Sequence, residues 1–389
     1  MAFNYQAPLP KDLFLLDPDV AFLNHGSFGA TPRPVFEKYQ AWQREMERQP
    51  VAFFVERFAG LLREARTVLA GYVHTAPDNV VYVANATTAL NTVARSLRLD
   101  PGDEIVTTDH EYGAMDRMWR FLCQKTGAVY RPVPLPLPLD TPGDLVERLW
   151  AGVTPRTRVL FFSHLTSPTA LILPARELCR RARAAGVLSI VDGAHALGQV
   201  PLDLDDLDAD FFTANAHKWL CAPKGSAFLY ARPEVQRLVE PLVVSWGNTS
   251  LTSTGSTFLD EQQWAGTRDI AAFLAVPEAI RFCEAHDWPR VRTECHRLVR
   301  HAREAIGALT GLPPICPDST EWYAQMATVP LPPCEAPKIK AQLYERFRVE
   351  VPVSEWQGRP YLRVSIQGYN TLADVERLLA ALQATLPSR

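Results

Sequence analysis

Short apolar runs alternate with helical patterns through the middle of the chain. Seven runs rich in β-branched and aromatic residues have the length of strands, and they occupy residues 80–83, 104–107, 128–131, 159–162, 188–191, 210–213 and 227–230. Helical segments such as 89–97 and 175–185 separate several of these runs. The alternation predicts an α/β fold built on a mostly parallel, seven-stranded sheet with helices on both faces.

The pattern changes on either side of this region. Residues 34–72 show a helical period, with Phe36, Tyr39 and Trp42 on one face. After about residue 275 a helix, a strand, a helix, a strand and a helix are predicted over 290–309, 326–331, 338–347, 360–366 and 373–386. We therefore expect a large domain of residues 20–275 and a smaller α+β domain of residues 276–389, with the N-terminal segment 1–19 packed against the smaller one.

Polar residues follow the carboxyl ends of several predicted strands. They form five loops, at residues 85–88, 110–112, 163–167, 192–195 and 215–218. In sheets of this kind ligands bind beyond the carboxyl ends of the strands. The loops are therefore expected to form one site.

Composition and charge narrow the class of function. The 389 residues are 47% hydrophobic and 21% charged, with a formal net charge of −3, so the chain lacks the basic surface that nucleic acid binding needs. No segment approaches the roughly 20 apolar residues of a membrane span, and residues 1–10 lack the pattern of a secretory signal, so a cytoplasmic location is expected. Seven scattered cysteines without a C-x-x-C pair favour reduced thiols over disulfides or a metal site.

Asp192 and Lys218 carry the strongest chemical signal. Asp192 ends one buried strand, and Lys218 follows the next strand along the chain. Among the seven lysines only Lys218 and Lys224 follow a strand into a loop, and Lys224 stands in a Pro-Lys-Gly turn. A lysine forms a Schiff base with the aldehyde of pyridoxal 5′-phosphate (PLP), while a carboxylate keeps the pyridine nitrogen protonated. The pair predicts a PLP enzyme, with an arginine as the structural alternative partner for Asp192.

Other polar residues give weaker signals. Residues 85–91 open a helix, whose N–H groups and hydroxyls suit a phosphate, although a cap without a ligand is the commoner arrangement. The candidates for the phosphate are Thr87, Thr88, Asn215 and His217. His195 is placed to donate to the phenolate oxygen of the cofactor, or to cap a helix.

Seven motifs, spread through both predicted domains, occur in an order that resembles a known family. They are residues 23–29, 109–112, 161–165, 191–195, 217–220, 266–269 and 362–366. Nearly the whole chain, from about residue 20 to 386, resembles the fold type I PLP enzymes of aminotransferase class V, and within them the isopenicillin N epimerase-like proteins. The resemblance implies a large PLP-binding domain and a small C-terminal domain.

The resemblance also implies a role for each matching residue around the cofactor. Lys218 is expected to form the Schiff base, Asp192 to pair with the pyridine nitrogen and His195 to contact the phenolate oxygen. The phosphate is expected on Thr87, Thr88, Asn215 and His217. Tyr112 is expected to stack on the ring, with His110 as the alternative.

On the substrate side, the resemblance implies that Arg363 binds the α-carboxylate and that Asn24 and His25 line the site. A bidentate arginine suits a carboxylate as lysine does not. Gly266 and Thr267 are expected to reach the phosphate of the neighbouring subunit, which implies a homodimer.

Two positions depart from the relatives. Ser167 replaces an asparagine that the desulfurases carry near the phenolate oxygen, and its shorter side chain is expected to need a water for the same contact. His25 replaces a threonine of the epimerases, and it adds a titratable group that is expected beside the substrate.

The reaction itself is left open by these residues. Reprotonation at Cα gives an epimerase or racemase, which the resemblance favours; β-elimination from an S-substituted cysteine gives a C–S lyase, and protonation of the cofactor carbon gives an aminotransferase. Residues 345–362 contain no cysteine, which disfavours a desulfurase. A non-enzymatic PLP-fold regulator is disfavoured by the charge balance.

The pocket for the substrate side chain is expected to draw on the partner subunit and on Trp246, Asn248, Phe258, Phe53 and Phe54.

Overall fold

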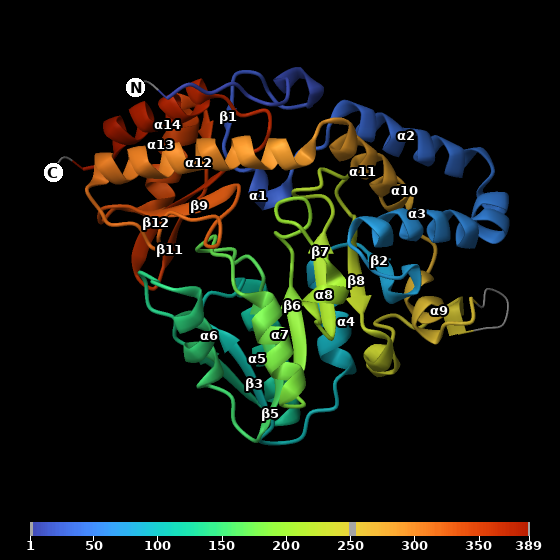
Figure 1. The fold of residues 1–389 in the computed structure, drawn as a ribbon. Helices are drawn as coiled ribbons and strands as arrows, with labels where there is room; N and C mark the ends of the chain where they lie inside the picture. The colour runs from blue at the N-terminus through green and yellow to red at the C-terminus, as the bar shows by residue number, and fades with distance from the viewer. Residues whose placement is uncertain (1–2, 249–253, 388–389) are drawn as a thin grey trace.

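A seven-stranded sheet forms the centre of the computed structural model, which describes residues 3–248 and 254–387 (Figure 1). The strands are β2 (Val80–Val83), β3 (Glu104–Thr108), β4 (Val129–Val133), β5 (Thr157–Ser163), β6 (Leu188–Asp192), β7 (Phe211–Asn215) and β8 (Ala227–Ala231). Their order is β2-β8-β7-β6-β5-β3-β4. All pairs are parallel except the two that β8 makes with β2 and β7. The expected α/β fold and its mostly parallel sheet are confirmed.

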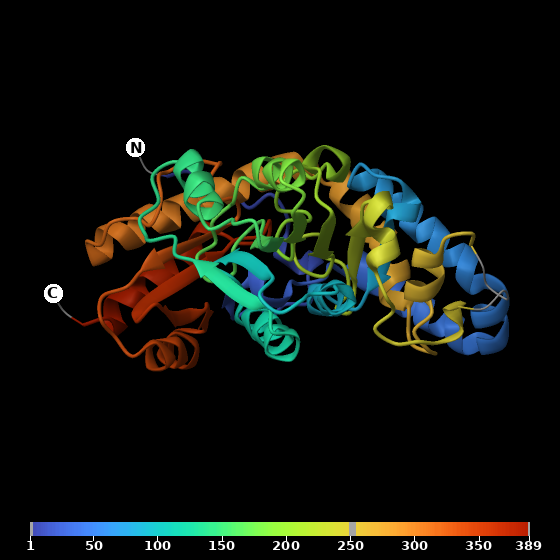
Figure 2. The ribbon, with the colours of Figure 1, turned by 90° about the horizontal axis from the view of Figure 1, so that it is seen from below.

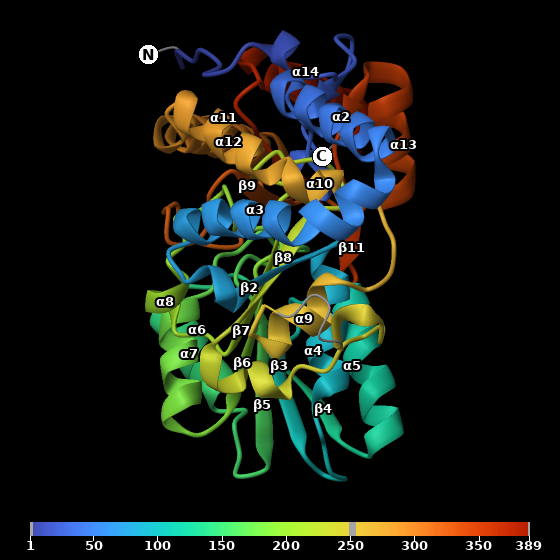
Figure 3. The same ribbon diagram turned by 90° about the vertical axis from the view of Figure 1, so that its right-hand side faces the viewer.

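Both faces of the sheet are covered, which explains why most strands carry runs of apolar residues rather than a regular alternation of apolar and polar ones. Phe161 packs in the core below α4 (Ala86–Ser96) and α5 (Gly113–Thr126), whereas the next residue, Phe162, belongs to the core below α6 (Pro142–Trp150) and α7 (Ala175–Ala184). Figure 3 shows the two helix layers on opposite sides of the strands. Both phenylalanines are fully buried.

The helical pattern of residues 34–72 corresponds to two helices joined by a turn of π-helix. They are α2 (Arg33–Arg48) and α3 (Phe58–Tyr72), with the π-helical turn at Ala52–Arg57. The short helices α9 (Thr257–Gln263), α10 (Ala271–Leu274) and α11 (Val276–Ala285) follow later in the chain, and α10 and α11 pack on α2 and α3. This group lies at one end of the molecule, with the C-terminal elements at the other (Figure 2).

The C-terminal part combines helices with a small antiparallel sheet. Its helices are α12 (Trp288–Thr310), α13 (Ala336–Phe347) and α14 (Leu372–Thr385), and its strands are β9 (Met326–Pro330), β11 (Val353–Trp356) and β12 (Arg359–Ser365), in the order β11-β12-β9. The five predicted elements are confirmed. β11 was not predicted, because its sequence Val-Ser-Glu-Trp lacks the apolar alternation of a strand. A separation into two domains at residue 275 stays a prediction.

The N-terminal segment reaches across the molecule to this part. The N–H of Leu9 donates to the carbonyl of Gly368 (3.0 Å), and the ring of Phe3 stacks on His301. β1 (Ala21–Phe22) then pairs with β10 (Val349–Glu350). Among the described helices, none is both long and apolar enough to cross a bilayer.

The turn at residues 24–29 brings the N-terminal segment onto the lysine loop. It forms the one-turn helix α1 (His25–Phe28) and ends at Gly29, whose φ is +70°. A Cβ added at Gly29 would lie 1.9 Å from the carbonyl oxygen of His217. Only glycine fits here, for its backbone conformation and for the close approach.

Candidate active site

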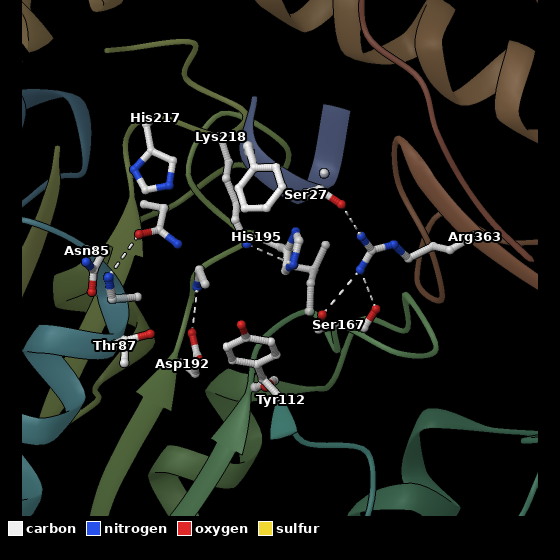
Figure 4. Close-up of a pocket in the computed structure, with 17 residues that line it drawn as sticks. Ser27, Asn85, Thr87, Tyr112, Ser167, Asp192, His195, His217, Lys218 and Arg363 are labelled. Atoms are coloured by element: carbon white, nitrogen blue, oxygen red, sulfur yellow. Dashed lines mark hydrogen bonds between the residues drawn. The ribbon is translucent and has the colours of Figure 1, made fainter. Parts of the chain in front are cut away.

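A cavity of about 390 Å³ opens at the carboxyl ends of the parallel strands. The five predicted loops converge there, and Figure 4 shows their side chains around the cavity. Its lining consists of Gly26, Ser27, Phe28, Asn85, Ala86, Thr87, Tyr112, Ser163, Leu165, Ser167, Asp192, Ala194, His195, Asn215, His217, Lys218 and Arg363. The polar side chains of the cavity therefore come from the region of the seven-stranded sheet and, through Arg363 on β12, also from the C-terminal part.

Lys218 lies next to His195 at the centre of the cavity. The lysine Nζ is 3.2 Å from Nε2 of His195, and the indole N–H of Trp219 donates to Nδ1 of the same ring (3.2 Å). Because an indole only donates, a neutral His195 carries its hydrogen on Nε2, facing Lys218. Burial, reinforced by the nearby Lys218, holds the pKa of His195 well below its ordinary value. Burial and the charge of Arg363 lower the pKa of Lys218 to about 8.

Asp192 closes the cavity at the end of β6. One of its carboxylate oxygens accepts the backbone N–H of Ala194 (2.9 Å). Burial raises the pKa of Asp192, while that hydrogen bond and Lys218 oppose the rise. Within the described residues no arginine pairs with this carboxylate. The alternative expectation, that an arginine neutralises Asp192 in a purely structural role, is therefore wrong. A cation in the cavity would supply the missing partner.

The first turn of α4 forms another wall of the cavity. Asn85 caps the helix by accepting the N–H of Thr88 (2.8 Å), and Asn215 accepts the N–H of Ala86 (2.9 Å). His217 points one ring nitrogen at the carbonyl of Ser226 (3.1 Å). A helix N-terminus with this polar surround attracts an anionic group.

Arg363 is a part-buried cation without an acidic partner among the described residues. One terminal guanidinium nitrogen donates to the carbonyl of Ser167 (2.6 Å), the other contacts the hydroxyl of Ser27 (3.3 Å), and Nε has no hydrogen-bond partner in the described part of the chain. Burial lowers the pKa of Arg363 to about 10. A part-buried guanidinium that lines a cavity and lacks an acidic partner is suited to bind an anion from outside the protein.

Comparison with known proteins places this arrangement in a family. The model of the family described as Aminotransferase class-V matches residues 27–378. This chain belongs to aminotransferase class V. Isopenicillin N epimerase of Amycolatopsis lactamdurans is 40% identical over 95% of this chain and 96% of that protein. A probable chloroplastic L-cysteine desulfhydrase of Arabidopsis thaliana is 30% identical over 94% of this chain and 83% of that protein.

Solved structures confirm the fold of this class V chain as that of the fold type I PLP enzymes. An apo cysteine desulfurase from Thermococcus onnurineus NA1 superposes with a TM-score of 0.83 at 22% identity, over 98% of this chain and 99% of the other. A variant of C-DES with glycine covalently linked to the PLP cofactor gives 0.81 at 21% identity, over 95% and 97%.

PLP is the cofactor of this class V chain. The cavity fits it, because a part-buried lysine, a carboxylate that forms no ion pair within the described part of the chain and a helix N-terminus face the same volume. The lysine matches the aldehyde of the cofactor, the carboxylate matches the pyridine nitrogen, and the helix N-terminus matches the phosphate.

The positions expected for Asn24 and His25 need correction. Neither residue lines the cavity; the neighbouring Gly26, Ser27 and Phe28 do. The ring of His25 is fully buried behind the lysine, 2.9 Å from the carbonyl oxygen of Lys218, and burial lowers its pKa to about 3. Rather than adding a titratable group beside the substrate, a neutral His25 supports the lysine loop.

Of the two aromatic candidates in the class V motif at residues 109–112, only Tyr112 lines the cavity. His110 is buried elsewhere: its ring nitrogens contact the hydroxyl of Thr169 (2.8 Å) and the carbonyl of Leu135 (2.7 Å). The alternative of a stacking His110 is therefore wrong, because both its ring nitrogens are engaged in the core.

Several other expected residues lie apart from the cavity. Thr88 does not line it, because its N–H and hydroxyl both point to Asn85. Thr267 is exposed and lies outside the cavity of its own chain. Phe53 and Phe258 are buried in the core, and residues 249–253 of the expected side-chain loop lie outside the described residues.

Three polar residues of the site were given no individual role by the sequence, although two of them, Ser163 and Glu111, stand in the predicted loops. Ser27 and Ser163 line the cavity, and Glu111 lies buried behind Ser163. All three stand inside motifs that had been recognised, so the motifs were the available signal. Serines and acids in loops are too common to be selected from a sequence without the contacts of the fold.

Proposed function

We propose that this chain is a PLP-dependent epimerase or racemase that inverts the α-carbon of an amino-acid-type substrate. The observation that carries the proposal is the part-buried Arg363, which has no acidic partner among the described residues and shares the cavity with Lys218 and Asp192. It provides a site for a substrate carboxylate next to the reacting groups. The 40% identity to an isopenicillin N epimerase supports epimerisation over the alternatives.

Each polar residue then has a defined task. Bound PLP supplies an electron sink that makes the hydrogen on Cα acidic. Arg363 orients the substrate through its carboxylate, and Lys218, with a pKa of about 8, exists partly as the free amine that accepts a proton. His195 offers its Nε2 hydrogen to the same region, and Asp192 supplies the negative charge that the pyridinium needs.

Isotope exchange tests the proposal directly. Purified enzyme loaded with PLP is incubated in deuterated water with a panel of amino acids, and NMR follows the α-hydrogen. We expect exchange at Cα and inversion without net loss of substrate, and no exchange in Lys218→Ala. Release of ammonia and a keto acid at the rate of exchange would reject the epimerase.

A C–S lyase is the second candidate, because an L-cysteine desulfhydrase-like relative matches nearly the whole chain. Elimination from an S-substituted cysteine requires no thiol of the enzyme. Cys334 is half-buried and lies outside the cavity, so it has no place in a desulfurase step here. The same incubation distinguishes the two candidates.

We also infer a homodimer in which Gly266 and Thr267 complete the phosphate site of the partner. The cavity of a single chain is open, since Phe28 lines it and is 72% exposed. Exposed apolar side chains lie elsewhere on the surface, including Val51 and Val244. The support for the dimer is therefore the open cavity beside the exposed Phe28, since single apolar side chains scattered over a surface are normal.

A further inference from the structure

Glu111 is a buried acid that the proposed reaction does not use. It lies between β3 and α5 and is 5% exposed. Its Oε1 is 2.6 Å from the hydroxyl of Thr108 and accepts the N–H of Ser163 (3.2 Å), while its Oε2 is 2.6 Å from Oγ of Ser163. Among the described residues no lysine or arginine forms an ion pair with it.

The charged group that faces Glu111 is Asp192, which is also an acid and carries a charge of the same sign. β5 and β6 are neighbours, and Ser163 is paired with Asp192 in their register, so both side chains point to one face of the sheet. Burial, together with the nearby Asp192, raises the pKa of Glu111 from 4.5 to about 8, although Ser163 and Thr108 oppose this. The phenol of Tyr130 on β4 stays neutral, because burial raises its pKa. Lys218 acts on Asp192 from the cavity side.

The hydrogens around the carboxyl can be assigned one by one. The hydroxyl of Thr108 accepts the N–H of His110 (3.2 Å), so its single hydrogen is free for Oε1 of Glu111. Oε1 also takes the N–H of Ser163. A proton on the carboxyl then lies on Oε2 and points at Oγ of Ser163, since a hydroxyl accepts as well as donates. The hydrogen of Ser163 is then free for another acceptor, and Ser163 and Asp192 line the same cavity.

We propose that Glu111 is a positioning residue: a neutral buried acid that donates to Ser163 and thereby orients the Ser163 hydroxyl as a donor toward Asp192. This role rests on the proposed use of Asp192 as partner of the pyridine nitrogen. A neutral Glu111 leaves Asp192 as the one charged member of this pair of acids. An ionised Glu111 would add a second charge and would reverse the Ser163 hydrogen bond.

Infrared spectroscopy of the protein without cofactor tests the protonation state. At about pH 7 the wild type is expected to show the C=O stretch of a carboxylic acid that Glu111→Gln lacks and that disappears as the pH rises through about 8. Glu104→Gln is the matched control. Glu104 is also buried, but Thr154 and Arg156 hold its pKa low, so this variant should keep the band. A Glu111 that is already ionised at about pH 7 overturns the proposal.

Cofactor affinity tests the consequence for Asp192. The PLP dissociation constants of Glu111→Gln and of the wild type are measured at about pH 7 and at about pH 9. Taking the ratio of the two constants at each pH cancels the titration of the groups that both proteins share. A coupling equal to about one pKa unit changes this ratio about tenfold. Ser163→Ala should make the change smaller, because the hydroxyl that transmits the hydrogen-bond part of it is gone and only the charge of Glu111 remains. A ratio that is independent of pH contradicts the role toward Asp192, whereas loss of all PLP binding in the wild type would reject the proposed function and leave the infrared result intact.

Discussion

At the scale of single residues, the chemistry of the site follows from which buried charges have partners. Glu104 and Asp210 are buried carboxylates that arginines neutralise, and their role is structural. Arg363 and Asp192 have no such partner among the described residues. A buried charge without a partner is costly, so its retention indicates a ligand that neutralises it.

The variant Arg363→Lys tests whether Arg363 binds the carboxylate of the substrate. Lysine keeps the charge but loses the bidentate geometry. We expect a loss of about 1.5–3 kcal/mol of substrate binding, the value for a hydrogen bond to a charged group, seen as a rise in KM of about 10- to 100-fold. Steady-state kinetics measure it. Arg359→Lys, an exposed position on the same strand, is the control. Equal KM values for both variants would contradict a carboxylate at Arg363.

The same scale includes a pH dependence of stability. Glu111 is protonated in the folded chain up to a pKa of about 8, against 4.5 ordinarily. Between these values the unfolded chain binds fewer protons, so this residue lowers stability as pH rises from about 4.5 to about 8. Glu111→Gln removes that slope. We expect urea unfolding to show a larger gain in the variant at about pH 8 than at about pH 5; an equal gain at both pH values, or the reverse order, would show that Glu111 is ionised in the folded chain.

At the scale of elements, the one-turn helix α1 couples distant parts of the chain. The carbonyl of Leu23 accepts the N–H of Ser365, His25 contacts the Lys218 loop, and Ser27 contacts Arg363. The lysine loop and the anion-binding strand β12 are thus held by a single short segment. Its geometry depends on Gly29.

Gly29→Ala is expected to disrupt this coupling. The left-handed φ alone costs about 1–3 kcal/mol, and the added Cβ meets the carbonyl of His217. Gly60→Ala in α3 is the control, since a Cβ there meets nothing within 4 Å and alanine favours a helix. Urea unfolding should show a loss in the first variant and a small gain in the second. An unchanged Gly29→Ala would mean that the turn readjusts freely.

At the scale of the whole molecule, the open cavity points to assembly. If Thr267 serves the partner, mixing Lys218→Ala with Thr267→Ala subunits produces dimers with one site that has both native residues. We therefore expect wild-type PLP affinity at up to half of the sites in hybrids that contain one subunit of each kind. Absorbance titration measures it, with Lys218→Ala mixed with the double variant as the control. A monomer in analytical ultracentrifugation, or no recovered site, would reject the shared arrangement.

The sequence alone determined the strands, most helices, the lysine and the acid, because apolar periodicity and strand ends are local properties. The tertiary structure decided which residue within each motif faces the cavity. His25 and His110 were expected in the site but turn into the core, whereas Ser27 and Tyr112, two residues further along in each motif, line the cavity. A rotation of one or two positions in a turn reverses the direction of a side chain. The packing of distant segments fixes that rotation: residues 365–369 and 217–218 against α1, and the 135 and 169 loops against His110.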